Sequence, residues 1–600
     1  MCHNKLNSSF LLICLTIVAA VLPRESRALT ITSGPFFTPA TNAPLAGLLE
    51  LTTDVDSRVS VSVNTGTNSW ERNFFDFDTT HSIPLLGFQP DQTNIITVTV
   101  YDEDFNSLTD TQSLTFITAP LPANFPHSVV LMSEPTNMEA GYTLLIVQNR
   151  TANSAYIVAY DNSGNVAWYI PWNTHDVDVR QLDDGDLFIE EPTPANHFLE
   201  VSMLGDTNEI FNAPSAYPVN VHDGVPTGNG TILYFSNVGR SVANFPLNDT
   251  NPNPAVATRT VSDDRIVEMS VTNGTALNVW STMDMLDPTR VTYLTYGEYS
   301  GAPDGVDNYH ANGVIEDTND NSIIVSLRNQ NAVFNFTRQG DLKWILGPHA
   351  LWSTSFQPFL LNPVGSPFEW NYGQHAPQLT PQGTLLVFDD GSYRASPYDP
   401  PVADQNNYSR GVEYSIDETN MTVSQVWDTT QAAGDVIYSP IMGKAQWLPQ
   451  THDVLVTYSF ITYLNGVHPS TNAPNATMVQ LIEYTHDPIP KVVFDLSFFD
   501  YDNTNSTYLG YLTYRSMRIP DLYAHPANPV SDIVTSEKGG SLDLEFAADP
   551  SHNYIVQAST DLKNWTSIGS AEVRNNNGEF DFIDTQANQF KSRFYRIITE

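Results

Sequence analysis

The chain has 600 residues, and its 26 Lys and Arg stand against 67 Asp and Glu, which gives a formal net charge of −41 at pH 7. Hydrophobic residues make up 41% and aromatic residues 11%, so the length predicts two to four folded domains and a disordered chain is excluded. The negative field repels phosphate, so we expect no nucleic-acid partner. Forty Pro and 32 Gly, without long amphipathic patterns, favour short strands joined by turns and therefore an all-β fold.

Residues 1–28 have the pattern of a signal peptide. Lys5 precedes an apolar run over residues 10–22, and the small residues Ser26 and Ala28 predict cleavage after Ala28. An uncleaved anchor is the alternative, although the run is short for a membrane span. Both cysteines of the chain lie in this segment, so the mature protein would have no disulfide and no thiol nucleophile. We expect a secreted or periplasmic protein with no membrane insertion after cleavage.

Two flanking regions alternate apolar and polar residues with a period of two. Residues 29–120, for example in the stretch 58–63, predict an N-terminal β-sandwich. A Pro-rich linker at 119–126 ends this region. Residues 530–600 predict a second, smaller β-sandwich module at the C-terminus. Neither flank shows a cluster of chemically active side chains.

The region between them, residues 127–523, repeats a hairpin with a fixed ending. An apolar strand and a turn are followed by a short polar step and an aromatic residue, and six copies end at Trp168, Phe211, Trp280, Trp344, Trp427 and Phe494. Repeats of several tens of residues, each with four short strands, are typical of a propeller with variable loops. We therefore expect a six-bladed β-propeller, preceded by one sandwich and followed by the other.

Histidines recur at one place in this repeat. The four are His175, His222, His310 and His375, each a short distance before the second strand of a repeat, and Lys444 takes the equivalent place in a fifth. The innermost strand of each blade lines the central channel, so residues at one repeat position should converge on the axis. A ring of hydrogen-bonding histidines that merely closes the hub is the alternative.

Arg328 follows the strand after His310, in a chain with few basic residues. A guanidinium among imidazoles would make an oxyanion site, because its rigid fork of donors fits a tetrahedral anion such as sulfate or phosphate. The alternative for Arg328 is a salt bridge to a surface carboxylate.

Several segments resemble the bacterial arylsulfotransferase (aryl-sulfate sulfotransferase) family over about residues 30–523. The most specific are Ser-Leu-Arg-Asn-Gln at 326–330, Lys-Trp-Ile-Leu-Gly at 343–347 and Gln-His-Ala at 374–376. The resemblance implies an N-terminal β-sandwich followed by a six-bladed propeller. The C-terminal module lies outside the family pattern.

The resemblance also implies roles for individual residues. His375 corresponds to the nucleophile, and the earlier hub histidine of the family falls on His222 or, less well, on His175. The residues expected to be catalytic are His375, His310, Arg328 and His222. Those expected to bind substrate are His175, Asn312, Gln374 and Lys444.

We therefore expect transfer of a sulfuryl group from an aryl sulfate to a phenol, independent of the nucleotide donor PAPS and ping-pong through a sulfohistidine at His375. A neutral imidazole is a competent nucleophile near pH 7. Arg328 and a protonated His310 would stabilise the transferring group, and His222 would exchange a proton with the phenol oxygen. No nucleotide, metal or other cofactor is required. The expected partners are the aryl sulfate and the phenol, and a homodimer is left open.

Two other functions stay open from the sequence. A non-catalytic secreted propeller could hold a sulfated ligand or a partner protein at the same hub. A calcium-dependent propeller hydrolase would need carboxylate and carbonyl ligands there, whereas the repeat places histidines.

Overall fold

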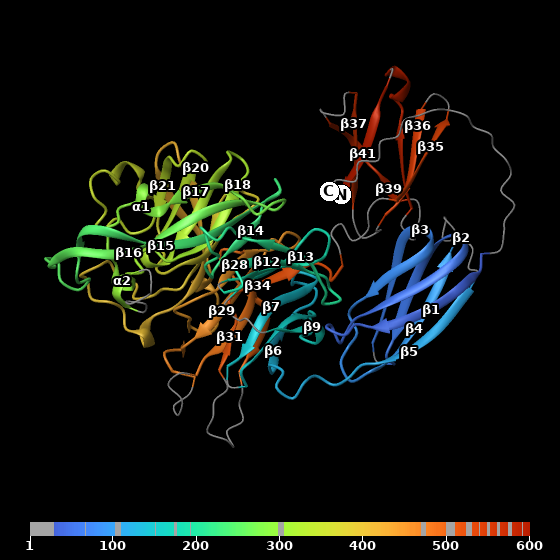
Figure 1. Ribbon diagram of the computed structural model, residues 1–600, viewed down its shortest axis with the longest axis horizontal. Helices are drawn as coiled ribbons and strands as arrows, with labels where there is room; N and C mark the ends of the chain where they lie inside the picture. Colours follow the sequence, from blue (N-terminus) through green and yellow to red (C-terminus); the bar gives the residue numbers. More distant parts are fainter. Residues whose placement is uncertain are drawn as a thin grey trace. The chain divides into compact units, whose positions relative to one another are not determined.

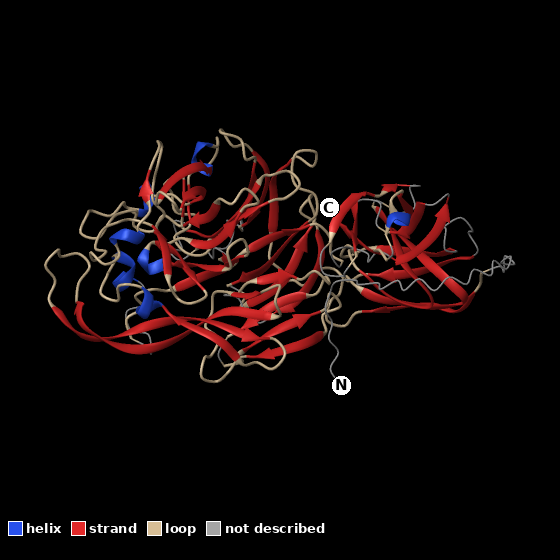
Figure 2. Cartoon of the chain, turned by 90° about the horizontal axis from the view of Figure 1, so that it is seen from above, coloured by secondary structure: helices blue, strands red, loops and turns tan. Residues whose placement is uncertain are grey.

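The computed structural model describes residues 29–66, 68–101, 110–150, 152–172, 177–192, 194–297, 305–469, 476–499, 510–523, 531–538, 541–548, 553–560, 565–573, 579–590 and 592–599. The signal peptide expected at 1–28 lies outside these residues. Strands dominate the described chain (Figures 1 and 2), so the prediction of an all-β fold is confirmed. Its α-helices within these ranges are the short α1 (Thr282–Met285) and α2 (Tyr293–Gly297). No helix in the described part has the length and hydropathy to cross a membrane.

The chain divides into two compact units, and one of them holds both ends of the chain: Met1–Pro120, Leu182–Gly185 and Asp521–Glu600. Its N-terminal sheet has the order β1 (Ile31–Pro39), β2 (Gly47–Asn64), β4 (Thr93–Tyr101) and β5 (Asp110–Ile117), with β3 (Ser69–Leu85) also paired to β2. In the first part of β2, Leu49 and Leu51 are buried whereas their neighbour Glu50 is exposed, as the period of two requires.

The C-terminal part of this unit contains two further sheets. One has the order β35 (Ser531–Lys538), β36 (Ser541–Ala547), β40 (Glu579–Asp584) and β39 (Glu572–Val573). The other has the order β38 (Thr566–Ser570), β37 (Tyr554–Ser559) and β41 (Phe594–Thr599). Phe546, Tyr554 and Phe580 pack at their core with ring centroids 4.8 to 5.8 Å apart.

The second unit, Leu121–Gln181 with Asp186–Pro520, contains six sheets of four or five strands in its described residues. The first joins β34 (Ser516–Ile519) and β33 (Tyr511–Leu512) to β7 (Tyr142–Asn149), β8 (Ser154–Tyr160) and β9 (Val166–Trp172). The second runs β10 (Val179–Gln181), β11 (Leu187–Glu191), β12 (His197–Val201), β13 (Thr207–Asn212). The third runs β14 (Gly224–Pro226), β15 (Thr231–Pro246), β16 (Val256–Ser270), β17 (Ala276–Ser281).

The other three sheets follow in chain order. The fourth runs β18 (Ala311–Asp317), β19 (Ser322–Leu327), β20 (Ala332–Thr337), β21 (Leu342–Leu346). The fifth runs β23 (His375–Leu379), β24 (Leu385–Asp389), β25 (Arg410–Asp417), β26 (Thr422–Asp428), with β22 (Asn362–Pro363) at its edge. The sixth runs β28 (Lys444–Trp447), β29 (Val454–Ile461), β31 (Met478–Tyr484), β32 (Val492–Phe498), β6 (Ser128–Ser133). A two-stranded ribbon pairs β27 (Ile437–Tyr438) with β30 (Tyr463–Leu464).

The two ends of this unit complete each other's sheets. β6, from its start, pairs with β32 of the last sheet, and β34, from its end, pairs with β7 of the first sheet. Strand exchange of this kind removes two exposed sheet edges. Because β34 pairs with β7, it takes the position in the first sheet that β14, β18, β23 and β28 take in four later sheets. The segment before β34 therefore corresponds to the segments that carry the histidines and Lys444.

The aromatic residue that ends each repeat has a structural role that explains the pattern. In three sheets its indole N–H donates to a carbonyl in the turn before the last strand of the next sheet: Trp168 to Met203 (2.7 Å), Trp280 to Arg338 (3.1 Å) and Trp427 to Asp487 (3.2 Å). Trp344 makes the corresponding contact with the Glu418 carboxylate, at 2.8 Å. The aromatic residue therefore recurs in the sequence because it joins each of these sheets to the next one.

Candidate active site

The starts of the inner strands carry the predicted histidines. His310 stands directly before β18, His375 begins β23, and Lys444 begins β28. His222 lies two residues before β14. His175 lies outside the described residues, so its predicted role stays a prediction.

Two of these histidines have unusual backbones. His222 has a φ of 120° and His310 a φ of 52°, both in the region that residues with a side chain rarely adopt. Such conformations persist where the surrounding structure over-determines them, which is typical of functional sites. The two rings lie 4.5 Å apart, centroid to centroid.

His375 is held in one tautomer. Its ring is 2% exposed, and Nδ1 lies 3.1 Å from the carbonyl oxygen of Gly373 and 3.0 Å from Oδ1 of Asp390. The Gly373 carbonyl can only accept, so Nδ1 carries the proton and Nε2 keeps the lone pair. Burial, and then the charges of Arg328 and Arg515, hold the pKa of His375 well below its ordinary value of 6.5. His375 is therefore a neutral imidazole whose Nε2 keeps its lone pair.

His310 and His222 differ in their partners. Nδ1 of His310 lies 2.6 Å from Oδ2 of Asp307. Burial raises the pKa of Asp307, but His310 and Arg328 outweigh it and the net pKa is lowered, so Asp307 is charged. Nδ1 of His222 is buried and finds no hydrogen-bond partner among the described residues. Burial and the neighbouring His310 hold the pKa of His222 well below 6.5.

Arg328 lies in the buried 3₁₀ turn Arg328–Gln330, directly after β19, and is 1% exposed. Its Nη2 donates to the carbonyl oxygen of Pro440 at 3.3 Å, and its Nε lies 3.8 Å from Oδ2 of Asp390. The backbone N–H of Arg328 donates to the carbonyl of His310 at 3.0 Å. Asp390 therefore stands between Arg328 and His375, and Arg328 is not a surface ion pair.

Arg515, which was not predicted from the sequence, enters the same group from the segment before β34 and acts electrostatically on His375. Its Nη1 lies 3.3 Å from Asp178 and 3.0 Å from Asp223, and its guanidinium lies 4.8 Å from the ring centroid of Tyr514. The Tyr514 ring is in turn 6.3 Å from that of His375. A sequence signal existed, because Arg515 precedes a short strand at the end of the repeat region 127–523, where the first sheet still lacks a strand.

Lys444 belongs to the charged part of this group. Burial, and then Arg180 and Arg515, lower its pKa to about 8, although Asp178 opposes them. Arg180 lies 2.6 Å from Asp223 and 3.0 Å from Asp178. These two carboxylates therefore neutralise the arginines that surround Lys444.

Gln374 and Asn312, which we expected to bind substrate, both make hydrogen bonds within the protein, and their role in substrate binding stays a prediction. The Gln374 side-chain amide donates to three oxygens on or beside β19 and β20, those of Ser326 (3.0 Å), Leu327 (3.2 Å) and Ala332 (2.9 Å). Asn312 donates to the Gln374 carbonyl at 2.8 Å, while its own Oδ1 is buried without a partner in the described chain. This geometry favours a positioning role for Gln374, whereas Asn312 retains an acceptor.

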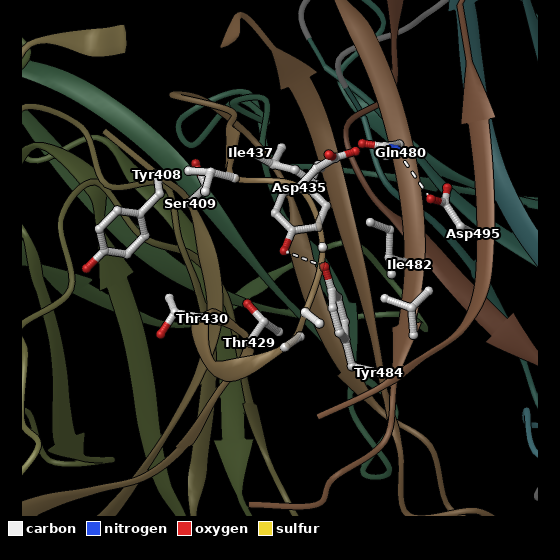
Figure 3. Close-up of a pocket in the computed structure, with 16 residues that line it drawn as sticks. Tyr408, Ser409, Thr429, Thr430, Asp435, Ile437, Gln480, Ile482, Tyr484 and Asp495 are labelled. Carbon is white, nitrogen blue, oxygen red and sulfur yellow. Dashed lines mark hydrogen bonds between the residues drawn. The ribbon is translucent and has the colours of Figure 1, made fainter. Parts of the chain in front are cut away.

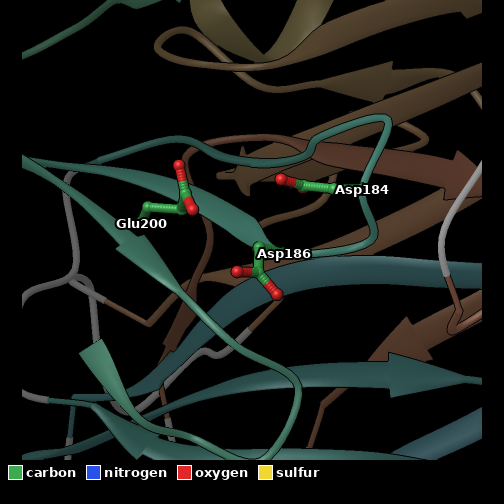
Figure 4. A group of neighbouring side chains, drawn as sticks. All are labelled: Asp184, Asp186 and Glu200. Atoms are coloured by element: carbon green, nitrogen blue, oxygen red, sulfur yellow. The ribbon is translucent and has the colours of Figure 1, made fainter. Parts of the chain in front are cut away.

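A cluster of carboxylates lies along another part of the chain: Asp184 in the turn after β10, Asp186 before β11, and Glu200 on β12 (Figure 4). The Asn208 side-chain amide donates to Asp186 at 2.5 Å. Partly exposed acidic groups of this kind are common without an ion, and we assign no metal to them.

The substitution Asp390→Asn tests whether the Asp390 carboxylate positions His375 through its Nδ1 atom. The amide removes the anion at Nδ1 but leaves the Gly373 carbonyl in place, so we expect kcat to fall by about 10 to 1,000-fold with KM nearly unchanged. Steady-state kinetics with an aryl sulfate donor measure this split. Asp417→Asn, at the exposed end of β25, is the matched control. A change in KM alone would contradict the positioning role of Asp390.

Comparison with known proteins places the chain in a family. The profile described as "Arylsulfotransferase (ASST)" matches residues 129–508, and that of the "Arylsulfotransferase Ig-like domain" matches residues 35–118. The chain is 26% identical to the arylsulfate sulfotransferase AssT of Escherichia coli O6:H1 (strain CFT073), over 67% of this chain and 81% of that protein. It is 28% identical to AssT of Lelliottia amnigena, over 48% of this chain and 54% of that protein.

A solved structure of a functionally unknown protein from Desulfotomaculum acetoxidans DSM 771 also aligns, at 12% identity and a TM-score of 0.28, over 70% of this chain and 96% of that chain. The family profiles together cover most of the region in which the buried histidines, Arg328 and the joined sheets lie. This chain is a member of the arylsulfotransferase family.

Proposed function

We propose that this protein is an aryl-sulfate sulfotransferase that uses no nucleotide donor and carries the sulfuryl group on His375. The tautomer of His375 carries this proposal, because Gly373 and Asp390 occupy Nδ1 and leave the Nε2 lone pair for attack. Family membership and the names of both relatives support the same activity.

In the first half-reaction Nε2 of His375 attacks the sulfur of the aryl sulfate. The N–S bond forms while the S–O bond to the aryl oxygen breaks, and the phenolate leaves with the electron pair. Charge spreads over the oxygens of the transferring group, as in phosphoryl transfer, so the preorganised guanidinium of Arg328 lowers the barrier. His310, anchored through Nδ1 by Asp307, is placed to give the departing oxygen its proton.

In the second half-reaction the oxygen of an acceptor phenol attacks the sulfur, and the N–S bond to His375 breaks. The phenol must lose its proton as the new S–O bond forms. His222 suits this step, because its lowered pKa keeps it neutral and its Nδ1 has no hydrogen bond to break. The sequence left His222 and His175 open for this role, and the place of His222 beside His310 supports His222. The proton that His222 accepts passes to His310, whose ring centroid is 4.5 Å away, so both histidines regain their starting states for the next turnover.

A burst experiment tests the proposal. Purified protein mixed with nitrophenyl sulfate alone should release about one nitrophenol per active site and then stall, and addition of phenol should restore steady release. Absence of release from any aryl sulfate tried would favour a scaffold that binds sulfated ligands without turnover.

The pH dependence of the donor half-reaction follows from the lowered pKa values. Protonation of His375 destroys the nucleophile, but its pKa lies well below 6.5, so the single-turnover rate should stay level as the pH falls through 6.5 and decline only at lower pH. On the alkaline side Lys444 loses its charge near pH 8, so donor affinity should weaken above that pH. Lys444→Met should remove the alkaline decline, and a decline that persists in this variant would exclude Lys444 as its source.

We also infer that the six sheets of the second unit are blades of one propeller. The indole bonds between successive sheets and the strands exchanged by its two ends support this arrangement. The domain boundaries, export after cleavage at Ala28 and a homodimer stay predictions.

A further inference from the structure

A cavity of about 470 Å³ lies between the fifth and sixth sheets (Figure 3). Its walls come from Tyr408 and Ser409 before β25, the segment 429–437 after β26, and the strands β29, β31 and β32. None of the histidines described above lines it, and the volume is that of a small-molecule site.

Part of the polar wall of this cavity consists of acceptors. Gln480 is 2% exposed, and its Nε2 donates to Oδ2 of Asp495 at 3.3 Å. With the amide nitrogen committed to Asp495, Oε1 of Gln480 is left buried without a hydrogen-bond partner in the described chain. Figure 3 shows this oxygen on the side of the amide away from Asp495, toward Asp435.

Two carboxylates and an unsatisfied carbonyl therefore face a space whose lining contains no Lys, Arg or His. Burial, with Asp435 adding to it, raises the pKa of Asp495 to about 6, even though Ser497 donates to its carboxylate. Asp495 is only partly exposed and no Lys, Arg or His of the lining balances its charge, so a bound cation would stabilise it.

The remaining wall is aromatic. Tyr458 and Tyr484 are 2% and 5% exposed, and their hydroxyls lie 3.2 Å apart. Tyr408 lies on another part of the wall. Tyrosine faces attract organic cations, and their rings pack against apolar groups.

We propose that this cavity binds a small organic ammonium ion that carries an aromatic or apolar group. The ammonium would donate to Gln480, Asp495 and Asp435, and its apolar part would contact the tyrosines. An anionic aryl sulfate would be repelled by the two carboxylates. A bare metal ion would leave most of the volume and the aromatic wall without contact.

Calorimetry on the full chain tests this with 2-phenylethylammonium as the probe. We expect it to bind at least about tenfold more tightly than the uncharged 2-phenylethanol, and phenylacetate not to bind. Asp495→Asn should lower the affinity for 2-phenylethylammonium by about tenfold or more, whereas Asp417→Asn should leave that affinity unchanged. Because Asp435 is exposed, Asp435→Asn gives the same test if Asp495→Asn does not fold.

His375→Asn distinguishes this cavity from the hub and should bind the probe as the wild type does. Three results would overturn the proposal: equal affinity for the charged and uncharged probes, no binding heat from any probe, or loss of probe binding in His375→Asn. Displacement of the probe by calcium at an equal concentration would assign the cavity to a metal ion instead.

Discussion

Replacing His375 by Asn should reduce sulfuryl transfer by about a thousandfold or more, because Gly373 and Asp390 fix the Nδ1 proton of His375 and leave its Nε2 lone pair free for attack. Asparagine is polar and smaller than histidine, so it should leave the hub folded. The wild type, incubated with donor alone, should gain a sulfuryl group on the peptide that contains Gln374 and His375. The variant should gain none. Mass spectrometry of peptides prepared without acid measures the label, since a nitrogen-bound sulfuryl group is acid-labile.

His452→Asn is the matched control, because His452 is exposed and its positive φ of 63° suits asparagine. It should be labelled and should turn over like the wild type. If His375→Asn still transferred at the wild-type rate, another group would be the nucleophile, and His310 would be the next to replace. A label on His310 in the wild type would contradict the assignment outright.

The positions of three site histidines could be predicted from the sequence, because residues at one place in the repeat occupy the same place in successive sheets. The aromatic ending of each repeat marks where a strand is joined to the next sheet, as Trp168 and Trp280 show. Counting along the repeat from such an ending places His222, His310 and His375 at the starts of inner strands. The repeat has a physical cause, since each repeated sheet must bury its face against its neighbours.

The parts that sequence reasoning missed depend on contacts between distant segments. Arg515 reaches the histidines only because the last strand of the unit completes its first sheet, and that closure is not a local property of the chain. In the sequence, nothing distinguishes Asp390 and Asp307 from other loop carboxylates. In the fold they lie within hydrogen-bond distance of the Nδ1 atoms of His375 and His310, respectively. The amide of Gln374 joins β23 to the sheet before it, which the sequence did not predict, and its expected role in substrate binding stays a prediction.

Arg328→Lys should lower the rate of the donor half-reaction by about 10² to 10³-fold, although it keeps the positive charge. The guanidinium is held by Pro440 through Nη2 and lies beside Asp390 through Nε, so its orientation is fixed before the donor arrives. A lysine ammonium is a point charge on a flexible stem and cannot present two donors in a plane to sulfuryl oxygens. Stopped-flow release of nitrophenol measures the loss.

Arg265→Lys, a partly exposed arginine 3.7 Å from Asp263, is the control and should react at the wild-type rate. The two half-reactions separate the roles of Arg328 further. If it stabilises the transferring group, both half-reactions should slow by a similar factor, because the sulfuryl oxygens are the same in each. If only donor affinity fell while single-turnover rates at saturation stayed at the wild-type value, Arg328 would serve binding alone, and the charge of the transition state would have to be met by Arg515 and His310.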